Sequence, residues 1–327
     1  MAYRKSAVVR NLDDRPVRAV MSRFDILFPS GKPFDVVGFG LNSVDFITIL
    51  PAFPSPNSKM EMVDFVPHGG GQTATAMVTC SRLGLKAKYV GKVGTDVWGE
   101  FSLQSILNEG VDVSAVTTEG GVKNQFAVVL VNGQTGERTI LWRRDKRLLY
   151  KAGELSREAI CQGRVLHVDG HDIEATLTAV LWAAEEGIVT VMDADRIDEK
   201  TGELIKHVDF LITSATFPSR FTGIASLPDA LMALKDSCRG FVAATLGSKG
   251  AVALMGGSPV YYKGLAVNAV DTTGAGDVFH GAFVFGLIKR WPVDQIFDFA
   301  NAVAGLKCTR FGGRAVPSLK ELESFLG

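Results

Sequence analysis

Two glycines, an alanine and an acid stand together near the C-terminal end of this 327-residue chain, in the stretch AVDTTGAGDVFHGAF. Gly274, Ala275 and Gly276 have small or absent side chains, so their backbone amides can approach an anion closely. Asp277 follows directly, and the apolar run after it predicts a helix whose N-terminus adds positive partial charge. A phosphoryl group held by these amides would lie beside Asp277, which could accept the proton of an attacking hydroxyl.

The same short pattern also has a purely structural interpretation. An Asp in the first turn of a helix suits the helix dipole, and glycine-rich turns are common. Four residues alone do not distinguish a catalytic turn from a structural one, so the surrounding elements of the sequence are needed.

From residue 35 the chain alternates between short apolar, β-branched runs and helical segments, a pattern typical of a doubly wound, mainly parallel α/β sheet with helices on both faces. The predicted strands are 34–40, 86–94, 164–170, 188–195, 209–215 and 240–247, and helices are predicted at 71–84, 98–110 and 174–187. In such sheets ligands bind beyond the carboxyl ends of the strands, where loops lead into helices.

Two stretches interrupt the alternation and read as β-hairpins, 46–71 and 124–145, the second around the turn signal NGQTGE. We therefore expect one α/β domain over 35–327, with a small β-strand lid made by excursions at about 46–68 and 122–147. The basic, weakly periodic residues 1–34 are expected to form an N-terminal extension.

The composition bounds the function. The chain is 46% hydrophobic and 21% charged, and 35 basic residues balance 35 acidic ones, so no overall field favours nucleic acid or an anionic membrane. The four cysteines form no C-x-x-C pair, and no apolar run reaches the length of a membrane span. These features predict a cytoplasmic protein that acts on a small molecule.

Four motifs together resemble the ribokinase (pfkB) family of carbohydrate kinases. The opening stretch resembles the family's C-terminal signature, and GGGQTATAMVTCSRLGLKAKYVGKVGTDVWGEF (69–101) its N-terminal signature. AATLGSKGA resembles its nucleotide-side turn, and FANAVAGLKCTRFGGRAVPS its final helix and loop. The resemblance runs from about residue 35 to the end and implies a ribokinase-like fold and transfer of the γ-phosphoryl group of ATP to a primary hydroxyl.

The resemblance assigns roles on the phosphate side of the site. It makes Asp277 the catalytic base and the preceding turn the anion hole. The residues that it places along ATP are Thr245, Gly247, Gly250 and Asn301, although Asn301 has the alternative role of satisfying a loop. Asp271 and Thr273 match residues around a monovalent-cation site, which leaves K⁺ dependence open because Asp271 could equally cap the turn.

On the sugar side the resemblance points to GLNSVD, in which Asn42 and Asp45 would bind sugar hydroxyls. Polyols need fixed carboxylate and amide partners because each hydroxyl both donates and accepts. The turn before the first predicted helix would come close to the sugar; it consists of Gly69, Gly70, Gly71 and Gln72.

One departure from the family concerns magnesium. Many relatives carry an N-x-x-E motif whose Glu helps to hold Mg²⁺, and here Ser214 and Phe217 stand at the Asn and Glu positions. Mg²⁺ is still expected, because the phosphate charge of ATP must be neutralised. Asp193 and Asp195 are the substitutes that the sequence offers, although both also fit an ordinary loop.

The triple glycine and the strand VMDADR look more like sulfofructose kinases and neighbouring ketose kinases than like ribokinase itself. An anionic substrate tail needs local cations. The second lid hairpin carries RTILWRRDKR, of which Arg138 and Arg144 are the predicted contacts; a solvated basic face is the alternative. A nucleoside kinase or a non-catalytic pseudokinase remains possible at this point, and the resemblance implies a homodimer formed through the lid.

Overall fold

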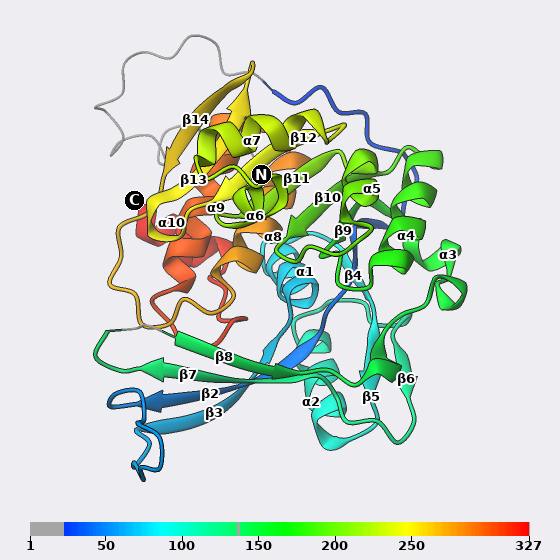
Figure 1. Cartoon of the computed structure of the whole chain (residues 1–327). Helices are drawn as coiled ribbons and strands as arrows, with labels where there is room; N and C mark the ends of the chain where they lie inside the picture. Colours follow the sequence, from blue (N-terminus) through cyan, green and yellow to red (C-terminus); the bar gives the residue numbers. More distant parts are fainter. Residues whose placement is uncertain (1–22, 136–137, 327) are drawn as a thin grey trace.

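An eight-stranded sheet forms the centre of the molecule (Figure 1). The computed structural model describes residues 23–135 and 138–326. The strand order is β14-β13-β12-β11-β10-β9-β1-β4; the strands from β12 to β4 run parallel, and β13 and β14 add an antiparallel edge. The strands of this sheet are β1 (Phe34–Phe39), β4 (Ala87–Val90), β9 (Gly163–Val168), β10 (Val189–Ala194), β11 (Phe210–Ser214), β12 (Phe241–Thr245), β13 (Gly250–Met255) and β14 (Ser258–Lys263).

Helices cover both faces of this sheet, as the alternation of strands and helices predicts. The helices are α1 (Gln72–Arg82), α2 (Val97–Leu107), α3 (Arg157–Ile160), α4 (Ile173–Glu185), α5 (Thr201–Leu204), α6 (Phe217–Thr222), α7 (Leu227–Asp236), α8 (Ala275–Ile288), α9 (Val293–Lys307) and α10 (Leu319–Leu326). Val36 belongs to the buried cluster that includes residues of α1, α8 and α9, whereas its neighbour Val37 belongs to the cluster that includes residues of α4 and α7, because successive strand residues point to opposite faces. The core thus has two halves, one on each side of the sheet.

The lid is a separate four-stranded sheet that projects below the α/β body in Figure 1. Its order is β3-β2-β7-β8, with strands β2 (Ser43–Leu50), β3 (Asp64–Gly70), β7 (Phe126–Asn132) and β8 (Arg138–Arg143). Both predicted hairpins are therefore present, and β2 and β7 join them in parallel. Part of the NGQTGE turn lies outside the described residues.

One predicted strand, 86–94, is divided in two. It breaks at Gly91, where a Cβ would lie 2.0 Å from the Tyr89 hydroxyl oxygen. The remainder, β5 (Lys92–Gly94), leaves the main sheet and pairs with β6 (Thr117–Glu119). The apolar pattern of the segment does not reveal which sheet each half joins, since both halves are buried.

The end of the predicted N-terminal extension packs on the body, and residues 1–22 lie outside the described part of the chain. Phe24 meets Phe210 and Phe241 edge to face, with ring centroids 4.9 Å apart in both pairs. At least this part of the extension therefore contributes to the core.

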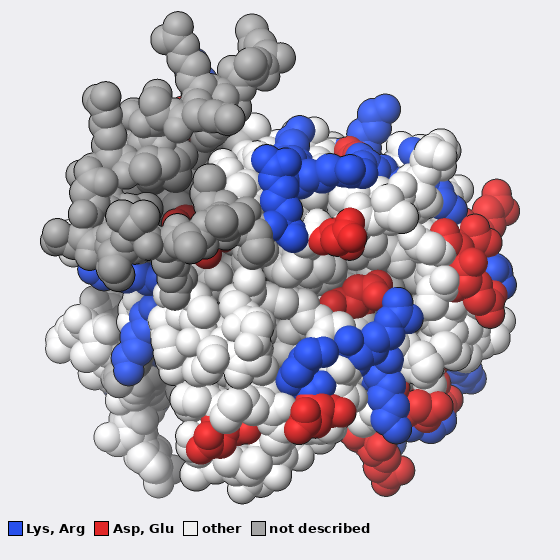
Figure 2. Space-filling model, turned by 90° about the horizontal axis from the view of Figure 1, so that it is seen from above, with Lys and Arg blue, Asp and Glu red and all other residues white. Residues whose placement is uncertain are grey.

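The surface agrees with a net charge of zero. On the face that Figure 2 shows, where grey atoms do not cover it, basic and acidic side chains lie close to one another. Within the described residues, the structure contains no helix with the length and apolarity needed to cross a membrane.

Candidate active site

Polar side chains gather at the carboxyl ends of the parallel strands. Asn42 follows β1, Asp169 follows β9, and Asp193 and Thr245 lie near the ends of β10 and β12. Because adjacent parallel strands end at one edge of a sheet, these side chains face a common region. The site therefore lies where the predicted fold class places it.

The glycine turn forms the N-terminus of α8. Gly274 is the N-cap residue with φ +74°, and a Cβ there would lie 2.8 Å from the Cα of Gly313. The amide of Ala275 donates to the Thr272 carbonyl at 3.2 Å. A Cβ on Gly276, by contrast, would meet nothing within 4 Å. The space beside the first turn is thus open at Gly276, and first-turn amides have no partner within a helix.

Asp277 is half-buried in the first turn of α8. Burial raises the pKa of its carboxyl to about 8, and the charges of Asp193, Asp45 and Asp169 add to this effect. Lys307 is the cation that opposes it. A carboxylate of this kind holds a proton more readily than an ordinary Asp, which suits it to accept one from a hydroxyl.

The predicted sugar contacts lie at the base of the lid. Asp45, on β2, is buried; burial raises its pKa, while the Ser43 hydroxyl, which donates to it at 2.9 Å, works in the opposite direction. Asn42 is also buried, and its amide donates to Ser102 at 3.3 Å. Two predicted ligands are therefore held in place before any substrate arrives.

Arg314 connects these residues to the C-terminal loop. It is buried, and burial lowers its pKa to about 10. Its guanidinium donates to the Asn42 side chain at 2.7 Å and to the Gly70 carbonyl at 2.6 Å.

The triple glycine permits close packing of these groups. A Cβ on Gly69 would lie 2.3 Å from the Arg314 guanidinium, and one on Gly70 would lie 2.0 Å from the Asp45 carboxylate. Gly71 has φ +93° and precedes α1 as its N-cap. A side chain would therefore be sterically unfavourable at each of these three glycines.

The Gln72 side chain links Asp193 and His171 at the opposite wall. Its side-chain amide donates to Asp193 at 3.1 Å, and its carbonyl oxygen lies 2.7 Å from the His171 ring nitrogen. Asp193 also faces His280 on α8, with Oδ1 3.3 Å from Nε2. Burial would raise the pKa of Asp193, but the His280 imidazole and the Gln72 amide leave it lowered.

The predicted nucleotide residues lie at the end of the sheet that β12 and β13 form. Thr245 donates to the Thr213 carbonyl at 3.4 Å, and Gly247 and Gly250 both have positive φ. The Asn301 amide donates to the Tyr262 and Lys263 carbonyls at 3.3 Å each. Asn301 therefore ties α9 to β14, the loop-satisfying role that the sequence left open, and its contact with a nucleotide stays a prediction.

The two predicted magnesium residues have different surroundings. Both carboxylate oxygens of the buried Asp193 face partners within the chain, whereas Asp195 is exposed and receives a 3.2 Å hydrogen bond from Ser214. Across the described residues, the structure brings together no group of three or more His, Cys, Asp or Glu that could hold a metal ion.

The surroundings of Asp271 and Thr273 include a lysine that the sequence interpretation does not use. The Asp271 carboxylate accepts from the Thr273 and Gly312 amides, both at 2.8 Å. The ammonium of Lys307 donates to the backbone carbonyls of Asp271 and Thr273. These oxygens are therefore already engaged by a cationic group.

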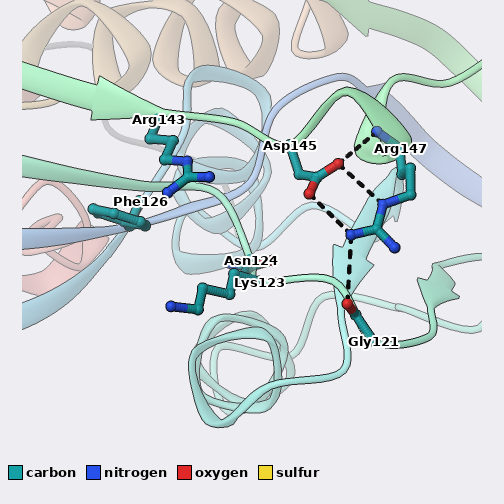
Figure 3. A pocket seen from close by; sticks show the side chains of 7 residues that line it. All are labelled: Gly121, Lys123, Asn124, Phe126, Arg143, Asp145 and Arg147. Carbon is teal, nitrogen blue, oxygen red and sulfur yellow. Dashed lines mark hydrogen bonds and ion pairs between the residues drawn. The ribbon is translucent and has the colours of Figure 1, made fainter.

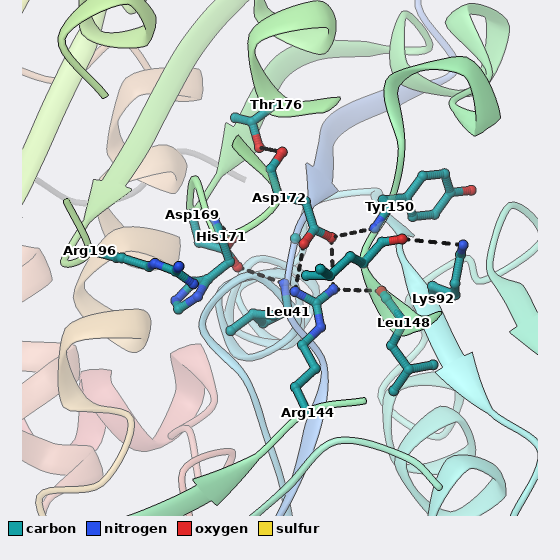
Figure 4. Close-up of polar contacts among 12 residues, drawn as sticks. Leu41, Lys92, Arg144, Leu148, Tyr150, Asp169, His171, Asp172, Thr176 and Arg196 are labelled. Carbon is teal, nitrogen blue, oxygen red and sulfur yellow. Dashed lines mark hydrogen bonds and ion pairs between the residues drawn. The ribbon is translucent and has the colours of Figure 1, made fainter. Parts of the chain in front are cut away.

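The basic residues of the second lid hairpin go to different places. Arg138 donates to the Thr272 hydroxyl in the loop before the glycine turn. Arg144 forms a two-pronged ion pair with Asp172, at 2.6 and 2.7 Å, and donates to the Leu148 carbonyl (Figure 4). The predicted substrate contact of Arg144 stays untested, but these three bonds indicate a structural role.

Two other basic residues of the hairpin, Arg143 and Arg147, line a pocket of about 250 Å³ at the base of the lid (Figure 3). Arg147 pairs there with Asp145 at 3.1 Å, and Arg143 and Lys123 contribute further positive charge. The run thus does not act as one basic patch.

Sequence reasoning missed four residues of this site: Asp169, His280, Lys307 and Arg314. Asp169 is buried and accepts from the Leu41 amide at 2.6 Å and from the Thr73 hydroxyl at 2.9 Å. The available signal was a charged residue inside an apolar context, as with the lysine in AVAGLKC. Such a pattern shows that a partner is needed, without showing which one.

The comparisons with known proteins agree with this geometry. Among curated relatives, a ribokinase of Haemophilus influenzae is 26% identical over 299 residues, covering 88% of this chain and 96% of the relative. Fructokinase-1 of Oryza sativa subsp. japonica is 28% identical over 320 residues, covering 89% and 96%. A solved structure of a ribokinase candidate from Agrobacterium tumefaciens superposes with a TM-score of 0.82 at 26% identity, covering 90% of this chain and 97% of that one.

The family assignment rests on nearly the whole chain. The sequence pattern of the pfkB family carbohydrate kinases matches residues 34–320, a range that contains the glycine turn, the lid and the strand ends described above. The likeness to the Agrobacterium tumefaciens structure shows the ribokinase-like fold independently of the motifs. This chain is a member of the pfkB family of carbohydrate kinases.

Proposed function

We propose that this protein transfers the γ-phosphoryl group of ATP to a primary hydroxyl of a ketose or a related sugar. The observation that carries the proposal is the position of Asp277. It lies in the first turn of α8, beside the open space at Gly276, with a pKa raised to about 8. Membership of a kinase family supports ATP as the phosphoryl donor.

In the proposed reaction the sugar binds between Asp45 and the Gly69–Gln72 turn. Asp277 accepts the proton of the hydroxyl as its oxygen forms a bond to the γ-phosphorus, while the bond from that phosphorus to the β-γ bridging oxygen breaks and ADP leaves. The amides at the N-terminus of α8 stabilise the negative charge on the transferring group. The lid excludes water, which would otherwise compete as the acceptor.

Magnesium would neutralise phosphate charge in this reaction. Of the two predicted residues, Asp195 fits this task better, because it is exposed and lies beside Ser214, which pairs with Thr245 in the sheet register. Asp193 has both oxygens engaged by Gln72 and His280, so a role in holding the sugar side of the site suits it better.

The substrate class is the finer part of the proposal. The relatives include both a ribokinase and a fructokinase, so the family does not select one sugar. Arg138 is the basic lid residue that reaches the catalytic loop, and the pocket with Arg143 and Lys123 adds positive charge near the lid base. These cations support a ketose with an anionic tail, although a neutral ketose uses the same catalytic residues.

Two other functions compete with this one. A nucleoside kinase would need aromatic stacking, but Phe46 packs against Phe65 and Phe126 within the lid and against Trp98 in the first turn of α2. A pseudokinase would need a disabled centre, whereas Asp277 and its glycine turn are in place. We also propose a homodimer through the lid and a cytoplasmic location, the latter because all four cysteines are free thiols.

The experiment is ATP turnover by the purified protein with Mg²⁺, against fructose, 6-phosphofructose, 6-sulfofructose, ribose and adenosine. A preference for an anionic ketose supports the whole proposal. A preference for fructose or ribose keeps the sugar kinase and removes the anionic tail. A preference for adenosine, or sugar binding without turnover, contradicts the proposal.

The matched control uses the same residue type at the same helix position. Asp277→Asn should lose about 100-fold to 10,000-fold of turnover, because the proton acceptor is gone. Asp229 is exposed and occupies the third position of α7, as Asp277 does in α8. Asp229→Asn should leave turnover unchanged; equal losses in both variants would show a helix effect in place of base catalysis.

A further inference from the structure

Lys307, the last residue of α9, is a lysine without exposed surface. A buried ammonium is costly unless hydrogen bonds and opposite charge compensate it. Lys307 donates to the Asp271 carbonyl at 3.0 Å and to the Thr273 carbonyl, and its nitrogen lies 3.8 Å from an Asp271 carboxylate oxygen. Two carbonyls and one carboxylate thus surround a single positive charge.

These oxygens belong to the segment that leads into the glycine turn. Thr273 directly precedes Gly274, the N-cap of α8. The Asp271 side chain accepts the Thr273 amide and also the Gly312 amide, so the same residue ties the segment to the C-terminal loop. Whatever holds the Asp271 and Thr273 carbonyls therefore also sets the orientation of the first amides of the helix.

Carbonyl and carboxylate oxygens that converge on one point are also the ligands that bind a monovalent cation. The family resemblance matched Asp271 and Thr273 to residues around such an ion and left K⁺ dependence open. In this chain the Lys307 ammonium holds both carbonyls, so the residues present do not fit an additional cation on the same oxygens.

We propose that Lys307 is a tethered replacement for a monovalent cation: its ammonium orients the segment before the glycine turn and provides a permanent positive charge beneath the anion hole. Lys307 is a positioning residue in this reaction, since it acts through the Asp271 and Thr273 backbone. The inference rests on the proposed kinase function for its activity readout. A tethered charge cannot dissociate, so the protein works without K⁺.

The first test needs only the unmodified protein. Turnover is measured at constant ionic strength with K⁺, Na⁺ or choline as the monovalent cation and saturating Mg²⁺. Equal rates in the three salts are expected. A rate that depends on K⁺ would overturn the proposal, because it would place an exchangeable cation in the mechanism.

The second test removes the ammonium in two ways. Lys307→Ala leaves a space lined by the freed oxygens, and we expect turnover in choline to fall about 10-fold to 100-fold and to recover with K⁺ or NH₄⁺. Lys307→Met fills the space with an uncharged chain, so its loss should not be reversed by any cation. A purely structural role would not distinguish K⁺ from choline.

A stability readout separates this inference from the kinase proposal. The melting temperature of Lys307→Ala should rise with K⁺ and not with choline, whereas the unmodified protein and Lys289→Ala should respond alike to both salts. Lys289 is an exposed lysine at the other end of α8. This result needs no substrate, so it supports the inference even if no sugar is phosphorylated.

With the alanine variant, two results would overturn the inference: Lys307→Ala with full activity in choline, or a folded Lys307→Ala that no cation rescues or stabilises. If Lys307→Ala does not fold, the turnover of Lys307→Met and the K⁺ dependence of the unmodified protein still test the inference. A Lys307→Met protein as active as the unmodified one contradicts a role for the charge.

Discussion

Asp277 lies in the field of three other carboxylates, those of Asp45, Asp169 and Asp193. This arrangement keeps a proton on Asp277 near neutral pH in the free protein, where its pKa is about 8. The same residue must lose that proton to act as a base. In the proposed reaction, Asp277 would thus make both turnover and stability depend on pH.

We expect the kcat/KM for the sugar to fall about tenfold per pH unit below pH 8 and to level off above it, because only deprotonated Asp277 accepts the hydroxyl proton. The measurement is the pH profile of kcat/KM with Mg²⁺ and ATP in excess. Asp229→Asn should show the same profile. A profile that is flat from pH 6 to 9 would argue against Asp277 as the titrating base.

The ionisation of Asp277 should lower the stability of the protein as pH rises, whereas it raises kcat/KM. An ordinary Asp ionises at a pKa of 3.8, so between that pH and about 8 the folded state holds a proton that the unfolded state has lost. Stability therefore falls as pH rises through this window and stays lowered above it. Asp277→Asn removes this cost.

Melting temperatures measured from pH 5 to 9 test this linkage. Asp277→Asn should melt above the unmodified protein at pH 9, and the difference should shrink towards pH 5. A difference that is independent of pH would mean that the substitution acts through packing.

At the scale of elements, the turn between β3 and α1 shapes the proposed sugar side of the site. Gly70 pairs with Ser43 across the β2-β3 ladder, and its position leaves no room for a side chain beside Asp45. The backbone of β3 that leads into α1 therefore lies directly against the Asp45 carboxylate of β2. The absence of room for a side chain at Gly70 therefore comes from the pairing of β2 with β3 as well as from the turn itself.

Gly70→Ala should displace the Asp45 carboxylate, since the new methyl group would lie 2.0 Å from it before relaxation. We expect the KM for the sugar to rise about 10-fold to 100-fold and the free energy of unfolding to fall by about 1–3 kcal/mol. Steady-state kinetics and urea denaturation measure the two effects. Gly120→Ala is the control, because a Cβ there meets nothing within 4 Å; an unchanged KM in Gly70→Ala would remove Asp45 from the sugar site.

At the scale of the whole molecule, the lid carries exposed apolar surface on an edge strand. β8 is the last strand of its sheet, and Leu141 and Trp142 are 56% and 63% exposed. Exposed edges with large apolar side chains are sites of association. This surface supports the proposed homodimer.

Leu141→Asp should convert a dimer to a monomer, because it places a charge in the proposed interface. Sedimentation velocity of the two proteins gives the masses. Leu181→Asp introduces the same change on α4, where Leu181 is 38% exposed, and should not alter the mass. A monomeric unmodified protein would contradict the lid dimer.

The sequence by itself predicted the α/β sheet, the two lid hairpins and the glycine turn before α8. These features depend on local periodicity and on turn residues, whose physical effect acts within a few positions. The division of 86–94 into two strands was not predictable in this way, because both halves are equally apolar and their partners lie elsewhere in the chain.

Only the tertiary structure decided which groups the buried cations contact. Arg314 reaches Asn42 across 272 positions, and Lys307 reaches Thr273 across 34. The partner of a long charged side chain depends on which distant segments of the chain lie beside it after folding. Once the side chain is buried it needs such a partner, because an unpaired buried charge is costly. The candidate residues for the chemistry were therefore readable in sequence, whereas the cations that contact them became visible only in the folded protein.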